Sequence, residues 1–185
     1  IFASSGAPIG EATPPINEEM APHPVSPYGA SKLAGEGYCS AYANTYGIDT
    51  IALRFGNVYG PRSKYKSSIV AKFIKQAIAG ETCEIFGDGT QTRDFIYIDD
   101  LTNAIMMAER FEGKGEIFQI ATGKERTVLE VAKILQNELN NYDVNMIIQH
   151  SKPRLGDVQS NYSDITKAKI KLGWEPYMEI ITGIK

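Results

Sequence analysis

The stretch Ser26-Pro27-Tyr28-Gly29-Ala30-Ser31-Lys32-Leu33 is the most informative part of this sequence. It places the phenol of Tyr28 and the ammonium of Lys32 four positions apart, where a helix is predicted to begin. Residues i and i+4 lie on one face of a helix, so both groups can reach the same point. A nearby cation favours a phenolate, which would suit Tyr28 to acid/base chemistry. The alternative is that Tyr28 packs in the core and Lys32 is a solvated surface charge.

The composition describes an ordinary globular protein. The chain has 185 residues, 43% of them hydrophobic, and a formal net charge of −3. This charge argues against a nucleic-acid partner, and no apolar run approaches the roughly 20 residues that cross a membrane. Two cysteines and two histidines without ligand spacing argue against a metal site. No basic segment typical of a signal peptide opens the chain. We therefore expect a cytoplasmic protein.

Apolar runs and segments of helical periodicity alternate along the chain. Gly47 is expected to end the first long helix, and the capping box Thr127-Val128-Leu129-Glu130 to open a later one. Asp99 or Asp100 is expected to cap a third helix. The alternation predicts an α/β fold with parallel strand pairing. Helices are expected over 28–46, 67–79, 101–110, 127–139 and 164–172, strands over 1–5, 49–55, 84–86, 93–98, 117–121 and 144–148, and loops over 11–27 and 56–62.

Three further motifs accompany the Tyr28/Lys32 pair. Ser4-Ser5-Gly6 closes a strand, Arg-Phe-Gly-Asn-Val-Tyr-Gly-Pro leaves another at 54–61, and Gly-Asp-Gly-Thr-Gln-Thr-Arg-Asp-Phe-Ile-Tyr-Ile-Asp-Asp spans 87–100. Together these motifs resemble the extended short-chain dehydrogenase/reductase family, and within it the nucleotide-sugar epimerases. The resemblance runs from Phe2 to about Ile184.

The resemblance implies the C-terminal part of a Rossmann-type parallel sheet plus a smaller α/β substrate-binding domain. Ligands would sit at the carboxyl ends of the parallel strands. Residues 1–62 would belong to the dinucleotide-binding domain and contain the catalytic helix. Residues 63–185 would form mainly the substrate-binding domain, with segments near 93–121 returning to the Rossmann sheet.

The resemblance also implies NAD as the cofactor and assigns catalytic roles to Ser5, Tyr28 and Lys32. Tyr28 would remove a proton from a sugar hydroxyl while the carbon beneath it gives hydride to NAD. Lys32 would hold the nicotinamide ribose and favour the phenolate, and Ser5 would bridge the same hydroxyl. Phe55 would line the nicotinamide side of the pocket. The structural alternative for Ser5 is a cap at the end of a strand.

The remaining matched positions would bind a UDP-sugar. Asn57 and Arg93 match contacts to the diphosphate, and Phe86 matches the uridine-binding edge. In the run Arg-Leu-Gly-Asp at 154–157, Arg154 would meet phosphate and Asp157 the ribose hydroxyls. Guanidinium forks match phosphate oxygens well, so two arginines at a diphosphate are chemically reasonable. The alternatives are a core role for Phe86, and salt bridges from Arg93 to its neighbour Asp94 and from Arg154 to Asp157.

Two features bear on the reaction and the sugar. Gly6 and Ala7 stand where related dehydratases carry Asp-Glu, and neither can move a proton, so elimination chemistry is disfavoured. Epimerisation at C4 needs only the Ser-Tyr-Lys set and is therefore the favoured reaction. Asn161 stands at a position where a bulky tyrosine would exclude N-acetylated sugars. UDP-N-acetylglucosamine is thus allowed alongside UDP-glucose.

One family motif does not occur in this sequence. The glycine-rich turn that holds the cofactor pyrophosphate is missing, so we expect the chain to be a C-terminal fragment that is inactive alone. A non-catalytic nucleotide-sugar-binding module is an alternative, as is another reaction such as reduction or C5 epimerisation. The helix over 28–46, with Gly35, Gly37 and its alanines, resembles one that pairs across the family's dimer; the alternative is that the same face sits on the sheet. A homodimer is therefore expected for the full enzyme.

Overall fold

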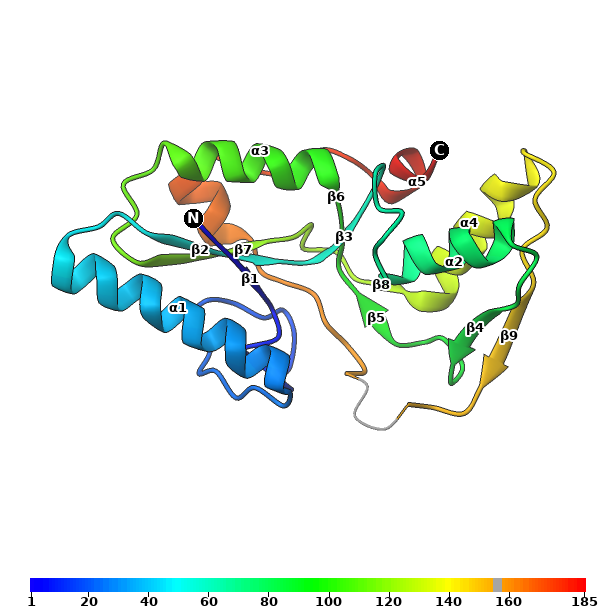
Figure 1. Cartoon of the computed structure of the whole chain (residues 1–185), viewed down its shortest axis with the longest axis horizontal. Coiled ribbons are helices and arrows are strands. Elements are labelled where there is room, and N and C mark those ends of the chain that lie inside the picture. The colour runs from blue at the N-terminus through cyan, green and yellow to red at the C-terminus, as the bar shows by residue number, and fades with distance from the viewer. Residues whose placement is uncertain (155–157) are drawn as a thin grey trace.

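The computed structural model describes residues 1–154 and 158–185. Its central sheet has three parallel strands in the order β1 (Phe2–Ser5), β2 (Ile51–Phe55) and β7 (Glu116–Ile120). Helix α1 (Pro27–Tyr46) lies along one face of this sheet, and α3 (Ile98–Glu109) lies on the other (Figure 1). Parallel strands require crossover connections, and helices supply them here. The predicted α/β class is confirmed.

Helix α1 has clear local reasons for its bounds. The side chain of Ser26 accepts a hydrogen bond from the backbone N–H of Gly29 at 3.0 Å, and Pro27 stands in the first turn, where its missing N–H costs nothing. Gly47 ends the helix in the left-handed region with φ 65°, which glycine adopts without strain. The predicted bounds of this helix are therefore confirmed to within one residue.

A second group of elements lies at the other end of the molecule (Figure 1). Strands β4 (Cys83–Phe86) and β9 (Ile148–Ser151) pair in parallel beside helices α2 (Ile69–Ile78) and α4 (Val128–Asn140). Three further short pieces join the two ends or close the chain. They are the parallel pair β3 (Asn57–Tyr59) and β6 (Phe95–Tyr97), the antiparallel pair β5 (Thr92–Arg93) and β8 (Arg126–Thr127), and the last helix α5 (Ile180–Ile184).

The two ends have separate apolar cores. One core joins the α3 face of the central sheet to α3 and to the π-helix η1 (Ala168–Leu172), and its largest side chain, Trp174, is fully buried. The other joins α2, α4 and the β4/β9 pair around Phe73. Two cores are what a two-domain chain would have, but the predicted boundary at residue 62 stays a prediction. Among the described residues, no helix combines the length and apolar character that a membrane crossing requires.

Three predicted strands or loops were wrong in part. The segment 56–62, predicted as a loop, contains β3, because Asn57 N–H donates to the Asp94 carbonyl and Tyr59 is buried. The strand predicted over 93–98 is split at Asp94, whose side chain turns to bind other segments. The last strand lies at Ile148–Ser151 instead of 144–148, because it pairs with β4 there.

The predicted cap of α3 was also wrong. Tyr97 occupies the N-cap position, and both Asp99 and Asp100 lie in the first turn. Asp100 is completely buried and accepts hydrogen bonds from the backbone N–H groups of Tyr177 and Met178, so it fixes the C-terminal tail. The predicted capping box is confirmed, because the Thr127 and Glu130 side chains bond reciprocally to each other's backbone N–H.

Candidate active site

A cavity of about 560 Å³ lies at the carboxyl ends of β1 and β2. This is where open parallel sheets bind ligands, because the strand ends and the following loops meet there. Ser5 and Phe55 are the last residues of the two strands, and both line the cavity. The other predicted site residues that line it are Tyr28, Asn57, Arg93 and Asn161.

Tyr28 and Lys32 lie together at the start of α1. The Tyr28 side chain is 55% exposed and lines the cavity, so the alternative of a core tyrosine is wrong. The Lys32 ammonium lies 5.6 Å from the centre of the Tyr28 ring and donates a hydrogen bond of 2.9 Å to the Ala3 carbonyl oxygen in β1. Lys32 is therefore tied to the strand that ends in Ser5, and it is more than a solvated surface charge.

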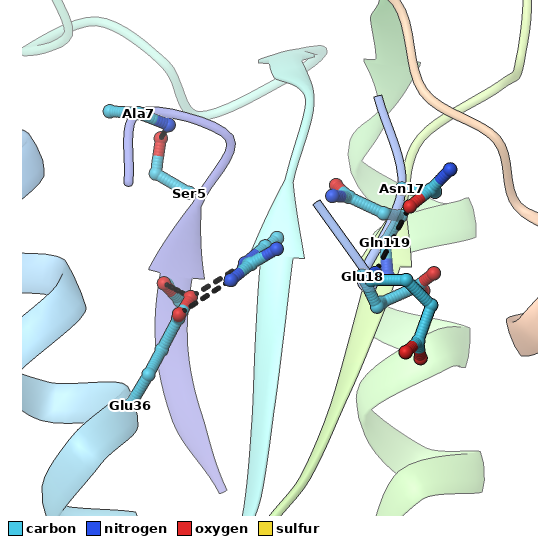
Figure 2. Close-up of polar contacts among 9 residues, drawn as sticks. Ser5, Ala7, Asn17, Glu18, Glu36 and Gln119 are labelled. Carbon is cyan, nitrogen blue, oxygen red and sulfur yellow. Dashed lines mark hydrogen bonds and ion pairs between the residues drawn. The ribbon is translucent and has the colours of Figure 1, made fainter. Parts of the chain in front are cut away.

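The Ser5 hydroxyl forms the strand-end cap that was the alternative interpretation, and its geometry is also compatible with its predicted role. It accepts a hydrogen bond from the backbone N–H of Ala7 at 3.2 Å, which is a strand-end cap (Figure 2). This bond uses one acceptor site of the hydroxyl, and the O–H can still donate. Since the residue also lines the cavity, Ser5 can cap the strand and contact a ligand at the same time.

The opposite wall of the cavity is suited to an anion. Arg93 and Asn57 line it together with Lys66 and Ser68. Ser68 is the N-cap residue of α2, and its hydroxyl is buried with no hydrogen-bond partner among the described residues. Helix N-termini and cations both favour negative charge. Lys66 and Ser68 were not singled out from the sequence, although a serine directly before a helical pattern is a usable signal.

Arg93 is held in place by the backbone around it. Its Nη1 donates to the carbonyl oxygens of Thr92 at 2.7 Å and Val158 at 2.6 Å. The neighbouring carboxylate of Asp94, 2% exposed, accepts from Thr122, Gly123 and Ser163. Burial raises the pKa of Asp94, and these hydrogen bonds oppose the rise. Asp94 therefore joins three segments behind the cavity, a role that its sequence position did not suggest.

Two further cavities continue from this wall. A cavity of about 220 Å³ is lined by Asn57 and Arg93 on one side and by Phe86 and Arg154 on the other. Phe86 and Arg154 also line a cavity of about 850 Å³ with His150. The Arg154 guanidinium stacks over the Phe86 ring at 4.5 Å from its centre, a favourable cation–π geometry. Phe86 is thus a cavity wall, whereas Asp157 lies outside the described residues.

These three cavities share lining residues, and together they bring most of the predicted site residues into one connected region. Ser5, Tyr28 and Phe55 stand at one end, Asn57 and Arg93 in the middle, and Phe86 and Arg154 at the far end. The region offers acid/base groups, then cations, then an aromatic face. No group of three or more metal-ligating side chains occurs among residues 1–154 and 158–185.

Comparison with known proteins finds close relatives over the whole chain. The UDP-glucose 4-epimerase of Mycolicibacterium smegmatis is 36% identical over 100% of this chain and 59% of its own length. The crystal structure of the Thermotoga maritima UDP-glucose 4-epimerase with UDP-glucose superposes with a TM-score of 0.89 at 41% identity, covering 100% of this chain and 60% of that one. The structure of the Bacillus cereus UDP-glucuronic acid 4-epimerase, in complex with UDP-glucuronic acid and NAD, superposes with a TM-score of 0.87 at 31% identity. The match covers 98% of this chain and 57% of that one.

The chain therefore spans about 60% of the length of the relatives it matches. The family model described as "NAD dependent epimerase/dehydratase family" matches residues 1–121, which is more than half of the sequence. The parallel sheet of the structure is the Rossmann-type sheet expected for such proteins. By sequence and by structure, this chain belongs to the NAD-dependent epimerase/dehydratase family.

Proposed function

We propose that the complete protein containing these residues epimerises a UDP-sugar at C4 with NAD as the cofactor. The single observation that carries this proposal is the cavity that Ser5 and Tyr28 share with Asn57 and Arg93, whose side chains could receive an anion. Acid/base groups beside an anion site are what a reaction on a sugar attached to a diphosphate needs.

The residues present fit one end of NAD. Phe55, half-buried at the end of β2, and Tyr28 both open on the cavity, and Lys32 lies beside Tyr28. These side chains would contact the nicotinamide and its ribose. NAD, when bound, would accept a hydride from the sugar carbon and return it. The glycine-rich turn that would hold the pyrophosphate does not occur in this sequence.

The proton would be handled by this chain's own groups. Tyr28 would take the proton from the sugar hydroxyl as the hydride leaves, and it would return the proton when the hydride comes back. Ser5 would hold the same hydroxyl through the donor capacity that its bond from Ala7 leaves available. The Lys32 ammonium would stabilise the negative charge that develops on the phenol oxygen.

Binding of the nucleotide would use the remaining walls. Asn57, Arg93 and the N-terminus of α2 would receive the diphosphate. The Phe86 ring and Arg154 would receive the uridine end, and we propose that Asp157 binds the ribose hydroxyls. For the sugar, Gly6 and Ala7 add no acid or base, which supports epimerisation over elimination. Asn161 leaves room for either UDP-glucose or UDP-N-acetylglucosamine.

The direct test is to purify the complete gene product and incubate it with UDP-glucose, UDP-glucuronic acid and UDP-N-acetylglucosamine in turn. The conversion can be monitored by NMR of the anomeric proton. Formation of the C4 epimer from any of the three would support the proposed function. A product reduced at C4 or inverted at C5 would favour the other reactions of the family. Tight binding of all three without turnover would contradict catalysis.

A non-catalytic nucleotide-sugar-binding module is the second candidate function, supported by the connected cavity walls of Asn57, Arg93, Phe86 and Arg154, which would suffice for binding alone. Isothermal titration of the 185-residue chain separates the two candidates. Binding of a UDP-sugar without binding of NAD would support a binding module. Aggregation without binding would support a part of an enzyme that needs the rest of its sheet.

We also propose that the complete protein is a homodimer formed through α1. The outward face of this helix exposes Tyr38, Tyr42 and Tyr46, with exposed fractions of 67%, 48% and 69%. Sedimentation of the complete gene product gives its mass directly. Replacing Tyr42 with glutamate would place a charge in this face and should yield monomers, whereas an unchanged dimer mass would contradict this face as the contact.

A further inference from the structure

A row of polar side chains crosses the central sheet one residue before its carboxyl edge. Ser4, Arg54 and Gln119 are direct partners in the parallel register of β1, β2 and β7. Partners in register point to the same face, and this face is the one that α1 covers. All three residues are buried, with at most 3% exposed. A cation such as Arg54 is not placed in such a position without a specific partner.

That partner is Glu36 in the middle of α1 (Figure 2). Its Oε1 accepts from Arg54 Nε at 2.8 Å and from the Ser4 hydroxyl at 2.5 Å, and its Oε2 accepts from Arg54 Nη2 at 2.8 Å. The Glu36 and Arg54 side chains are each 2% exposed. The ion pair is therefore bidentate and buried, and it is hydrogen-bonded to both strands that border the candidate active site.

This ion pair is an unusual way to attach a helix. Gly29 and Glu36 are the only buried residues of α1, so the helix buries no large apolar side chain. Gly35 lies so close to the Phe2 ring that a Cβ there would collide with it. A buried ion pair contributes little net stability because removing two charges from water is costly, but it demands one geometry. The pair therefore fixes where α1 lies on the sheet.

The position of α1 on the sheet matters for the candidate active site because this helix carries Tyr28 and Lys32. Tyr28, Lys32 and Glu36 follow one another at intervals of four residues, so they lie along one stripe of the helix. The strand partners of Glu36 directly precede two cavity residues, since Ser4 precedes Ser5 and Arg54 precedes Phe55. We propose that Glu36 is a positioning residue, which through Arg54 and Ser4 sets the place of Tyr28 and Lys32 relative to Ser5. This role rests on the proposed function.

The test uses the complete gene product and two variants. Glu36→Gln keeps the shape of the side chain and removes its charge. Arg54→Lys keeps the charge but replaces the guanidinium, so the bidentate bond to Glu36 cannot form. Misplacement of reacting groups by about 1 Å can lower turnover about 100-fold, and we expect each variant to lose kcat to about this extent. The KM for the UDP-sugar should stay unchanged, because Asn57, Arg93 and Arg154 are not altered. If Glu36→Gln fails to fold, Arg54→Lys carries the test.

A matched control is the exposed ion pair of Lys124 and Glu179. Its atoms lie 2.6 Å apart, with the side chains 60% and 58% exposed, and it lies away from the cavity. Glu179→Gln should leave kcat unchanged. A purely structural role for Glu36 would lower the melting temperature and the amount of folded protein while kcat per folded site stayed at the wild-type value. That result would overturn the positioning role.

Crystal structures of the wild type and Glu36→Gln separate this inference from the proposed function, since they need no activity. A shift of the Tyr28 hydroxyl relative to Ser5 would support positioning even if the reaction were found to be different. An unchanged Tyr28 position in the variant would contradict it, whatever the enzyme's reaction. If the wild-type protein showed no epimerase activity, that result would refute the proposed function but not the positioning role of Glu36.

Discussion

The Lys32 ammonium lies beside the ring of Tyr28, 5.6 Å from its centre, and is bonded at the same time to the backbone of β1 at Ala3. A lysine in this arrangement connects the helix that carries Tyr28 to the strand that carries Ser5. Lys32 therefore lies beside Tyr28 and is linked to Ser5 only through the strand that carries it. Tyr28, more than half exposed, is open to a ligand from the cavity side.

Replacing Tyr28 with phenylalanine should remove the acid/base group and leave the ring. General acid–base catalysis contributes about 10²- to 10⁴-fold, so we expect kcat for the C4 epimerisation to fall by about 10³-fold or more. Steady-state kinetics of the complete gene product with UDP-glucose would measure the loss. Tyr38→Phe is the matched control, because Tyr38 lies on the same helix and is 67% exposed but does not line the cavity. Near-normal turnover of Tyr28→Phe would rule out its assigned role.

Replacing Arg154 with glutamine should weaken nucleotide binding. The change removes the cation that stacks on Phe86 and would meet phosphate. A hydrogen bond to a charged group is worth about 1.5–3 kcal/mol, so the dissociation constant for UDP should rise at least about 10-fold. Titration calorimetry at two salt concentrations would measure it. Arg110→Gln, an exposed arginine at the end of α3, should bind UDP like the wild type. Equal affinities for both variants would place the nucleotide elsewhere.

The sequence predicted local features better than distant contacts. The C-terminal end of α1 followed from Gly47, since a helix cap acts within a few positions, whereas the cap that Ser26 provides at the N-terminal end was not predicted. Strand β2 followed from its apolar run, but Arg54 within that run gave no hint of its partner. Glu36 stands 18 positions earlier on another element, and only the packing of α1 on the sheet brings the two together.

In the candidate site, too, some residues could be predicted from the sequence and others became evident only from the packing. Ser5 and Phe55 were assigned through the resemblance to the family, and the structure places both at the carboxyl ends of parallel strands, where they line the cavity. Lys66 and Ser68 were not found, because nothing near them in the sequence shows that α2 points its N-terminus at that edge. Asp94 was considered only as a partner of Arg93, whereas its side chain bonds Thr122 and Ser163, which are 28 and 69 positions away.

Replacing Thr127 with alanine should destabilise α4. The Thr127 side chain accepts from the Glu130 backbone N–H at 3.0 Å, and alanine would leave this donor without its cap. Losing such a cap costs about 1 kcal/mol of the free energy of unfolding, which urea denaturation can resolve. Thr102→Ala is the matched control, because the Thr102 hydroxyl only donates back to the Asp99 carbonyl within the N-terminal part of α3. Equal losses in both variants would contradict a specific capping contribution.

Glu18 gives a prediction for the pH dependence of stability. Burial raises the pKa of this carboxyl above 4.5, although its bond from the Gln119 backbone N–H opposes the rise (Figure 2). A raised pKa means that the folded state disfavours the carboxylate. This cost is absent at pH values below 4.5, where both states are protonated, and it develops as pH rises through the folded-state pKa.

Glu18→Gln should therefore be more stable than the wild type at pH 7, because the amide oxygen can still accept from Gln119 and no charge is buried. The two proteins should become equally stable as pH falls below 4.5. Urea denaturation of both proteins across this range measures the difference at each pH. Glu19→Gln, which alters the exposed neighbouring residue, should follow the wild-type curve throughout. A Glu18→Gln protein that is less stable than the wild type at pH 7 would show that the charge itself holds this loop on β7.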